Sequence, residues 1–291
     1  MKKIDPKLLE KPEIKEKELA PLPGDTENVV VRIPPGPEKY PHMGHAISFM
    51  INYMYAEKYK GKVWLRFEDT NPDKCKREFY DVIKQGLRWL GIEWGLEKNE
   101  SDSLKMYYTR AKRLIDSDNA YVCTCDVETV RNNRRSGKVC DCRINSVEEN
   151  LKLWQKMFDE FKQGEAMLRL KGDIEAKDTS FRDPMLMRIN DTPHCWTGNK
   201  FRVWPGYDFT NAIEDSECGI THVLRSNEFN TRLQKHLREL MGYKKHPEYV
   251  EYGRYNIIGG VTKGRVIREL VENGTVSGWD DPRLMTVKAI E

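Results

Sequence analysis

The stretch that decides the fold reads Val29-Val30-Val31-Arg32-Ile33, Pro34-Pro35-Gly36-Pro37-Glu38-Lys39-Tyr40-Pro41, His42-Met43-Gly44-His45 and Ala46-Ile47-Ser48-Phe49-Met50-Ile51-Asn52-Tyr53-Met54-Tyr55. The first run is short, apolar and β-branched, which is typical of a strand buried in a parallel sheet. Four prolines and a glycine within residues 34–41 exclude both helix and ladder, so this part is a loop. The last run is apolar at helical spacing. Strand, loop and helix in this order make half of a βαβ unit, and ligands bind beyond the carboxyl ends of such strands.

Two histidines, His42 and His45, stand at the predicted N-terminus of this helix. Free backbone N–H groups and the helix dipole favour anions there, so two imidazoles beside them suit the phosphates of a nucleotide. An H-x-G-H tetrapeptide taken alone is more often a pair of capping or surface histidines, and the neighbouring residues are needed to separate the two interpretations.

Those neighbours carry a resemblance to a known family. Arg32, the Pro-rich loop, H-x-G-H, the apolar helix and then Leu65-Arg66-Phe67-Glu68-Asp69-Thr70-Asn71-Pro72 resemble the class I aminoacyl-tRNA synthetases, and within them the glutamyl-tRNA synthetases of archaeal and eukaryotic type. The resemblance covers residues 29–291. It implies an α/β fold with a Rossmann-like, doubly wound parallel sheet and an inserted α+β subdomain that binds the acceptor end of tRNA. It also implies a catalytic core alone, because the sequence ends at Glu291, before the anticodon-binding barrels of that family.

The same resemblance divides the chain into segments. Residues 1–28 are rich in Lys, Glu and Pro and are expected to form a flexible or surface-draped arm. Residues 29–114 are the first half of the catalytic domain, 115–200 the insertion, 201–245 the second half, and 246–291 a lysine-loop and stem-contact region.

The bulk composition fits a soluble enzyme. Hydrophobic residues make up 38% of the chain and charged residues 33%, while the net charge of +3 is too small to indicate a nucleic-acid partner by itself. No apolar run approaches the about 18 residues of a membrane span, and the N-terminus has no signal-like core. We therefore expect a cytoplasmic protein without a membrane partner, and a monomer.

Candidate substrate residues follow two other predicted strands. Glu68 directly follows the strand predicted at 62–67, at its carboxyl end, and so faces the same crevice as His42. The resemblance implies that Glu68 binds the α-ammonium of the amino acid. The alternative is an acidic run that only caps the next helix, and we assign that capping to Asn71 or Asp73 instead. Tyr207 and Asn211 are four residues apart, share a helix face, and by resemblance face the substrate side chain.

Arg32 and Arg225, at the end of the buried run 219–225, bracket the crevice with two guanidinium groups that keep their charge. An amino acid with two carboxylates needs two such groups, whereas glutamine needs one, and the resembled glutaminyl enzymes lack arginine at the second position. The sequence therefore favours glutamate. Structural ion pairs of these arginines with Glu68 or Asp215 remain the alternative.

Four cysteines form two tight pairs, Cys123 with Cys125 and Cys140 with Cys142, separated by fourteen residues. Two C-x-C knuckles can close a tetrahedral Zn²⁺ site, and in a reducing compartment this is preferred to disulfides. Four reduced thiols without an ion are the alternative. The segment between the pairs is basic and could lie on RNA phosphates; it contains Arg131, Arg134, Arg135 and Lys138.

Residues 259–266 stand where the family has a mobile lysine-bearing loop. The resemblance implies that Lys263 and Arg265 neutralise ATP phosphates in the transition state. The match requires one extra loop residue; without it Gly264 takes the lysine position and the segment is an ordinary turn. The loop before His42 also differs from the pattern of the resembled family, which has a small residue, a glycine and a leucine where this chain has Glu38, Lys39 and Pro41. Glu38 adds a negative charge near an anionic substrate.

The function implied is ATP-dependent activation of glutamate and its transfer to the 3′ end of tRNA, with Mg²⁺ arriving on ATP. His42, Gly44, His45, Lys263 and Arg265 would bind ATP; Arg32, Glu68, Tyr207, Asn211 and Arg225 would bind glutamate. Three alternatives stay open: an enzyme of the same fold that glutamylates a modified tRNA base, a non-catalytic tRNA-binding paralog, and a fragment of a longer synthetase.

Overall fold

The structure, a computed structural model, describes residues 18–229, 231–253, 261 and 264–291. The first part of the predicted N-terminal arm and Lys263 lie outside the described residues. The described part of the arm, residues 18–28, lies against the domain: Leu22 is buried and its N–H donates to the Tyr59 hydroxyl at 2.9 Å, while Pro23 O contacts His222.

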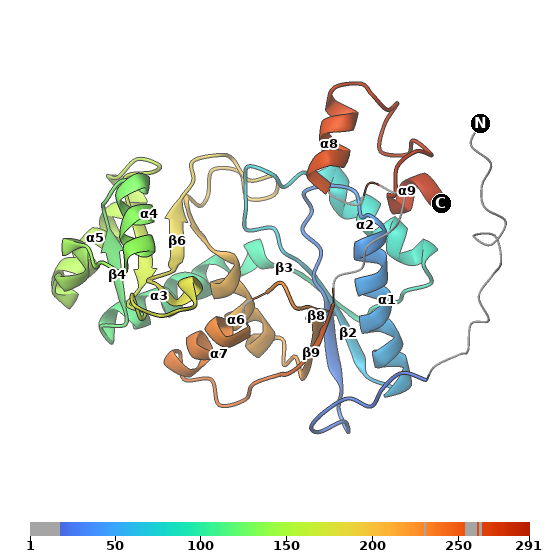
Figure 1. The fold of residues 1–291 in the computed structure, drawn as a ribbon, viewed down its shortest axis with the longest axis horizontal. Coiled ribbons are helices and arrows are strands. Elements are labelled where there is room, and N and C mark those ends of the chain that lie inside the picture. Colours follow the sequence, from blue (N-terminus) through green and yellow to red (C-terminus); the bar gives the residue numbers. More distant parts are fainter. Residues whose placement is uncertain (1–17, 230, 254–260, 262–263) are drawn as a thin grey trace.

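A parallel sheet forms the centre of the molecule. β1 (Val30–Ile33), β2 (Lys62–Phe67) and β3 (Leu96–Asn99) pair in parallel, and so do β8 (His222–Ser226) and β9 (Glu248–Tyr252). Thr221 N donates to Val30 O at 2.9 Å, which sets β8 beside β1 and gives the order β3-β2-β1-β8-β9. This confirms the predicted doubly wound sheet, whose strand order reverses between β1 and β8, where such folds bind ligands (Figure 1).

Helices cover both faces of the sheet (Figure 1). α1 (Met43–Lys58) and α2 (Arg77–Trp89) bury Phe49, Phe79 and Ile83 against β1 to β3. On the other side lie α6 (Tyr207–Glu217) and α7 (Thr231–Leu240), which share a second core with α3 (Leu104–Asp116).

The predicted cap of α2 is wrong. The helix begins at Arg77 behind Lys76, which makes no side-chain cap. Asn71 Oδ1 instead accepts a hydrogen bond from Arg188 at 3.2 Å, and the Asp73 carboxylate accepts one from Asn190 at 2.8 Å. Both side chains therefore join the end of β2 to the second sheet.

This second sheet is antiparallel and contains β4 (Ala120–Cys123), β5 (Met167–Leu170), β6 (Met185–Ile189) and β7 (Val203–Pro205), so it continues past residue 200. α5 (Val147–Asp159) packs on it, and Ser146 caps that helix by accepting from Glu149 N at 3.2 Å. α4 (Val127–Ser136) lies between the cysteine pairs. Three short 3₁₀ turns span Glu100–Ser103, Asp141–Ile144 and Thr179–Phe181.

The C-terminal segment supports the loop before α1. It contains α8 (Gly264–Glu272) and α9 (Val287–Ile290). Met43 N donates to Met285 O and Val287 N to Pro41 O, at 2.9 and 2.8 Å, and the ring of Tyr40 stacks on Trp279. The loop thus has a fixed position although it has no regular structure.

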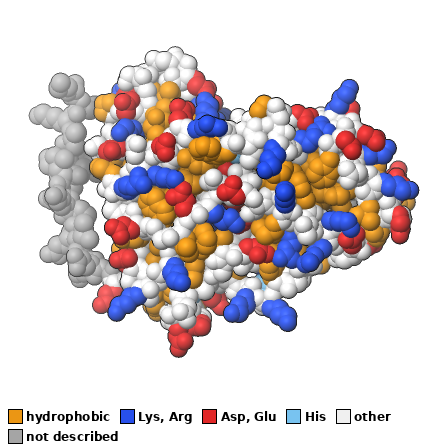
Figure 2. All heavy atoms as spheres, turned by 180° about the vertical axis from the view of Figure 1, so that it is seen from behind, with side chains coloured by type: hydrophobic (Ala, Val, Ile, Leu, Met, Phe, Trp, Pro, Cys, Tyr) orange, Lys and Arg blue, Asp and Glu red, His pale blue; other side chains and the backbone are white. Residues whose placement is uncertain are grey.

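In the described part of the chain, no helix has both the length and the apolar character needed to cross a bilayer. Figure 2 shows cationic and anionic side chains interspersed over the rear face, consistent with the small net charge.

Candidate active site

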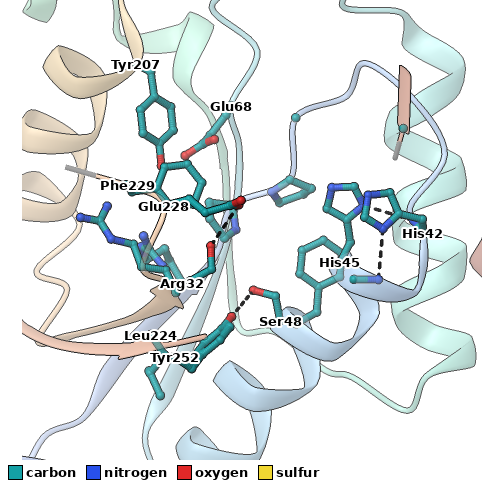
Figure 3. A pocket seen from close by; sticks show the side chains of 18 of the residues that line it. Arg32, His42, His45, Ser48, Glu68, Tyr207, Leu224, Glu228, Phe229 and Tyr252 are labelled. Atoms are coloured by element: carbon teal, nitrogen blue, oxygen red, sulfur yellow. Dashed lines mark hydrogen bonds between the residues drawn. The ribbon is translucent and has the colours of Figure 1, made fainter. Parts of the chain in front are cut away.

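A cavity of about 480 Å³ opens at the carboxyl ends of β1 and β8, a volume ordinary for a small-molecule site. It brings together residues that the sequence analysis selected from distant parts of the chain (Figure 3): Arg32, His42, Gly44, His45, Glu68, Tyr207 and Arg225. The two arginines line the same cavity rather than opposite faces of the sheet.

The histidines cap α1 reciprocally. His42 Nδ1 accepts from Gly44 N at 3.1 Å, and His45 Nδ1 accepts from the backbone N–H of His42 at 3.1 Å. A nitrogen that accepts carries no proton, so each neutral ring has its proton on Nε2. Burial lowers the pKa of His45 well below its usual value, and the neighbouring His42 and Lys39 lower it further. At neutral pH this helix end therefore offers N–H donors and a dipole.

Glu68 is held by a buried network beneath the cavity. Arg66 donates from Nη2 to Asn211 Oδ1 at 2.8 Å, and Asn211 Nδ2 donates to Glu68 Oε1 at 3.0 Å. Because Arg66 has only donors, it fixes the amide oxygen of Asn211 toward itself and the amide nitrogen toward Glu68. Asn211 thus sets the direction of the carboxylate that lines the cavity.

Asp215 on α6 is the anionic centre of this network. It lies 2.7 Å from Arg66 Nη1, 3.4 Å from Arg32 Nε and 3.3 Å from Arg238 Nη2. Burial alone would raise the pKa of Asp215, but Arg66, Arg32 and Arg238 outweigh it and bring the value to about 2. The structural ion pair of Arg32 with Asp215 is present, and Arg32 also lines the cavity, so the two interpretations of this residue are compatible.

The carboxyl group of Glu68 behaves differently from Asp215. Burial raises the pKa of Glu68, and Arg66, the Asn211 hydrogen bond and Arg32 offset only part of that shift. Its side chain keeps 18% of its accessible surface, toward the cavity. A carboxylate that lacks full compensation from the protein is suited to bind a cationic group of a ligand.

Arg225 is held by neutral groups. Its Nη1 donates to Gln234 Oε1 at 2.9 Å and its Nη2 to Thr231 Oγ1 at 2.8 Å, while Nε has no hydrogen-bond partner. Among the described residues no carboxylate forms an ion pair with Arg225, although only 3% of its surface is exposed. A buried guanidinium without an anion is what a carboxylate ligand would neutralise. Tyr207 stacks on Phe229 at the rim of the same cavity.

Some predicted residues lie elsewhere. Asn211 is fully buried behind Glu68, and Arg265 is 88% exposed, pairs with Glu269 and does not line the cavity. Glu38 does not fill the cavity: it pairs with Lys74 at 3.6 Å and lines a neighbouring space of about 560 Å³.

The sequence analysis gave no role to Arg66, which organises the network. An arginine among the apolar residues at the buried end of β2 signals a buried charge that needs a partner. It also missed Ser48 and Tyr252, which line the cavity and share a hydrogen bond of 2.7 Å (Figure 3). No local pattern connects these two residues.

The four cysteines of the C-x-C pairs converge, with their sulfur atoms all within 4.8 Å of one another. The Sγ atoms of Cys123 and Cys140 are 3.8 Å apart, as are those of Cys125 and Cys142. A tetrahedron with Zn–S bonds of about 2.3 Å has edges of about 3.8 Å, so the spacing fits that metal. Arg169 Nη1 points at Cys123 and Cys140, at 3.7 and 3.9 Å, as a donor that would stabilise thiolates.

The basic segment between the cysteine pairs is partly used inside the protein. Arg134 donates to the carbonyl oxygens of Arg182 and Thr179, both at 2.9 Å. Arg131 and Arg135 stay exposed.

The chain is similar in sequence to proteins of known family. The family described as tRNA synthetases class I (E and Q), catalytic domain, matches residues 28–291. The glutamate–tRNA ligase of Nitrosopumilus maritimus is 44% identical over 264 residues, covering 90% of this chain and 46% of that protein. The glutamate–tRNA ligase of Methanobrevibacter smithii is 42% identical over 292 residues, covering 100% and 52%. This chain therefore spans about half the length of these curated relatives.

Among solved structures, a glutamate tRNA ligase from Elizabethkingia meningosepticum, crystallised with its amino acid, superposes with a TM-score of 0.60 at 21% identity. The alignment covers 78% of this chain and 49% of that one. A glutamate-tRNA synthetase from Elizabethkingia anophelis gives a TM-score of 0.57 at 22% identity, covering 79% and 52%. These likenesses support the fold.

Proposed function

The chain belongs to the class I tRNA synthetases for glutamate and glutamine, and from that membership we propose that it activates glutamate with ATP and transfers it to the 3′ end of tRNA. One observation carries the choice of glutamate: Arg32 and Arg225 line one cavity together with Glu68, beside the paired histidines of α1. Two guanidinium groups and one carboxylate complement a ligand with two carboxylates and one ammonium.

In the proposed reaction the α-carboxylate of glutamate attacks the α-phosphorus of ATP, and pyrophosphate leaves. A hydroxyl of the terminal ribose then attacks the acyl carbon, and AMP leaves. No side-chain nucleophile is needed, so the residues act by positioning and by stabilising charge. Glu68 binds the α-ammonium, the arginines bind the carboxylates, and the Nε2 donors of His42 and His45 bind phosphate or ribose.

Several roles belong to the proposal as well. Mg²⁺ would arrive with the ATP phosphates and neutralise part of their charge. The four cysteines would hold a structural Zn²⁺, for which their spacing is suitable. Residues 115–200 would bind the acceptor end of tRNA, and Lys263 would approach the leaving pyrophosphate. Asn211 acts through Glu68 in this proposal, since its amide already donates to that carboxylate.

The test is exchange of labelled pyrophosphate into ATP, measured with glutamate or glutamine and with or without tRNA. We expect exchange with glutamate and much less with glutamine. Absence of exchange under every condition would overturn the proposal. Charging of periodate-oxidised tRNA separates the alternatives, because transfer to a modified base survives loss of the 3′ diol and transfer to the terminal ribose does not.

A matched pair of variants links the activity to the cavity. His42→Asn keeps an N-cap acceptor for Gly44 N but removes the imidazole. His236→Asn makes the same exchange on α7, where the ring packs against Phe181. Only the first should slow exchange, and equal activities would count against nucleotide binding at His42.

A further inference from the structure

Lys39 is a cation of the cavity to which neither the comparisons nor the proposed reaction assigns a role. It lies in the Pro-rich loop before α1, and its side chain lines both the 480 Å³ cavity and the neighbouring space of 560 Å³. The hydrogen bonds of the loop to Met285 and Val287 give the lysine a fixed base.

The side chain of Lys39 runs directly over the start of α8. A Cβ atom built on Gly264 would lie 2.5 Å from Lys39 Nζ and 2.9 Å from its Cδ, so a larger residue there would displace the end of the lysine side chain. Gly264 itself lines the cavity. One turn further along α8, Arg268 donates to Glu38 O at 2.7 Å and joins the helix to the same loop.

This position is electrostatically unfavourable unless an anion is bound. The ammonium stands at the positive end of α8 and near Arg268, and within the described residues no oxygen accepts a hydrogen bond or forms a salt bridge with it. The nearest acid, Glu38, pairs with Lys74. Burial lowers the pKa of Lys39, Glu38 opposes the shift, and Arg268 and Lys74 add to it.

The other cavity groups set where such an anion would sit. His42 and His45 lie on the same side of the cavity as the loop, while Glu68 lies beside Tyr207 across from them (Figure 3). The α1 and α8 end therefore offers the N–H donors of a helix N-terminus and the Lys39 ammonium, and the groups expected to bind the amino acid are gathered at the other end. A polyphosphate matches the first end in charge and in its need for several donors.

We propose that Lys39 binds the phosphate chain of the nucleotide, as a cation held by the loop before α1 at the start of α8. This deepens the proposed function, because it names a further phosphate-binding residue of the same site. The Lys39 ammonium then adds, from a fixed loop, to the charge that the proposed function assigns to Lys263.

The test compares K39M, which keeps the aliphatic stem, with K39R, which keeps the charge, and with K156M as the matched control, because Lys156 pairs with Glu160 on the surface of α5 away from the cavity. We expect K39M to raise the KM for ATP in pyrophosphate exchange roughly 10- to 100-fold, the loss expected for one charge-assisted contact. The KM for glutamate should stay within about twofold. K39R should recover most of the affinity, and K156M should match the original chain.

A second variant tests the geometry. G264A places a methyl group 2.5 Å from the position of the ammonium and so displaces it; the change should weaken ATP binding when Lys39 is present and add little in the K39M background. Equal effects of G264A in both backgrounds, or a K39M protein that folds and binds ATP like K156M, would overturn the proposal. A loss of ATP affinity in K39R as large as that in K39M would overturn it too, since the charge would then be irrelevant.

Direct measurement of nucleotide binding tests the role of Lys39 independently of the proposed synthetase activity. Calorimetry with ATP, AMP and tripolyphosphate needs no turnover, so it can be read even if the chain shows no exchange. We expect K39M to lose affinity for ATP and tripolyphosphate but not for AMP. A loss for AMP of the same size would place Lys39 away from the β- and γ-phosphates and contradict the assignment.

Discussion

Replacing Arg225 by methionine tests the recognition of the second carboxylate. Arg225 is 3% exposed and has no carboxylate partner among the described residues, so its charge is available to a ligand. Hydrogen bonds to charged groups contribute about 1.5–3 kcal/mol each, and a two-pronged contact is incompletely additive, so we expect a loss of about 2–4 kcal/mol. That loss corresponds to a fall of roughly 30- to 1000-fold in kcat/KM for glutamate.

The same change has a separate structural cost. Gln234 Oε1 and Thr231 Oγ1 each lose a donor, which should lower the free energy of unfolding by about 1–3 kcal/mol. Gln234→Ala removes one of these bonds without removing the charge; it also removes the hydrogen bond that Gln234 donates to Asp208 at 3.0 Å, so its loss of stability is an upper limit for that part of the structural cost. Arg202→Met, which breaks the surface pair with Asp191, controls for loss of an arginine elsewhere.

The assay is pyrophosphate exchange at varied glutamate and varied ATP, with thermal unfolding measured in parallel. We expect a higher KM for glutamate and an almost unchanged KM for ATP. A variant that unfolds earlier but keeps its KM for glutamate would show that Arg225 is purely structural. A rise confined to the KM for ATP would mean that Arg225 faces the nucleotide, and either result would refute the reasoning.

Three further predictions concern charge and metal. Asp215→Asn should lower the free energy of unfolding by about 3–5 kcal/mol in urea, because three buried guanidinium groups lose their anion; a loss below about 1 kcal/mol would contradict this. The pKa of Asp215 is lowered from 3.8 to about 2, so the ionised carboxylate stabilises the folded protein by roughly 2 kcal/mol above pH 4, and this stabilisation disappears as the pH falls toward 2. Acid unfolding of the original protein and of Asp215→Asn should show this difference. Because the pKa of Glu68 is raised, the KM for glutamate should increase on acidification at a pH above the ordinary value of 4.5, and Glu68→Gln should have a high KM that no longer varies there. Removing zinc with a chelator should lower the unfolding temperature, and Cys140→Ser should abolish zinc binding. Purified protein that contains no stoichiometric zinc by mass spectrometry would rule the site out.

The buried network explains why several of these residues have two functions. Asp215 holds Arg32 and Arg66 in place, Arg66 orients Asn211, and Asn211 directs Glu68 into the cavity. Substitutions of the residues in this buried network should therefore affect stability and glutamate binding together. Substitutions at Lys39 or His42 should act mainly on nucleotide binding. This difference separates the two halves of the cavity by experiment.

The sequence by itself determined the features that depend on local order along the chain. The apolar run at 29–33, the prolines after it and the helical period beyond predict strand, loop and helix, and with them the position of His42 at a helix N-terminus. The C-x-C spacing likewise brings thiols together over a short separation. Period, proline chemistry and short loops are properties of neighbouring residues, so they can be deduced without coordinates.

Only the tertiary structure decided which partners the polar side chains take. Arg66 and Asp215 are 149 residues apart in the sequence, and their side chains form a hydrogen bond of 2.7 Å. Asn71, expected to cap a helix, accepts a hydrogen bond from Arg188, 117 residues away. Asn211, expected to face the ligand, lies behind Glu68 because Arg66 fixes the direction of its amide. A polar group can satisfy its hydrogen bonds with any partner that the fold brings near, and burial makes that choice obligatory. Local pattern identifies such a residue, but only the packing of distant elements selects its partner.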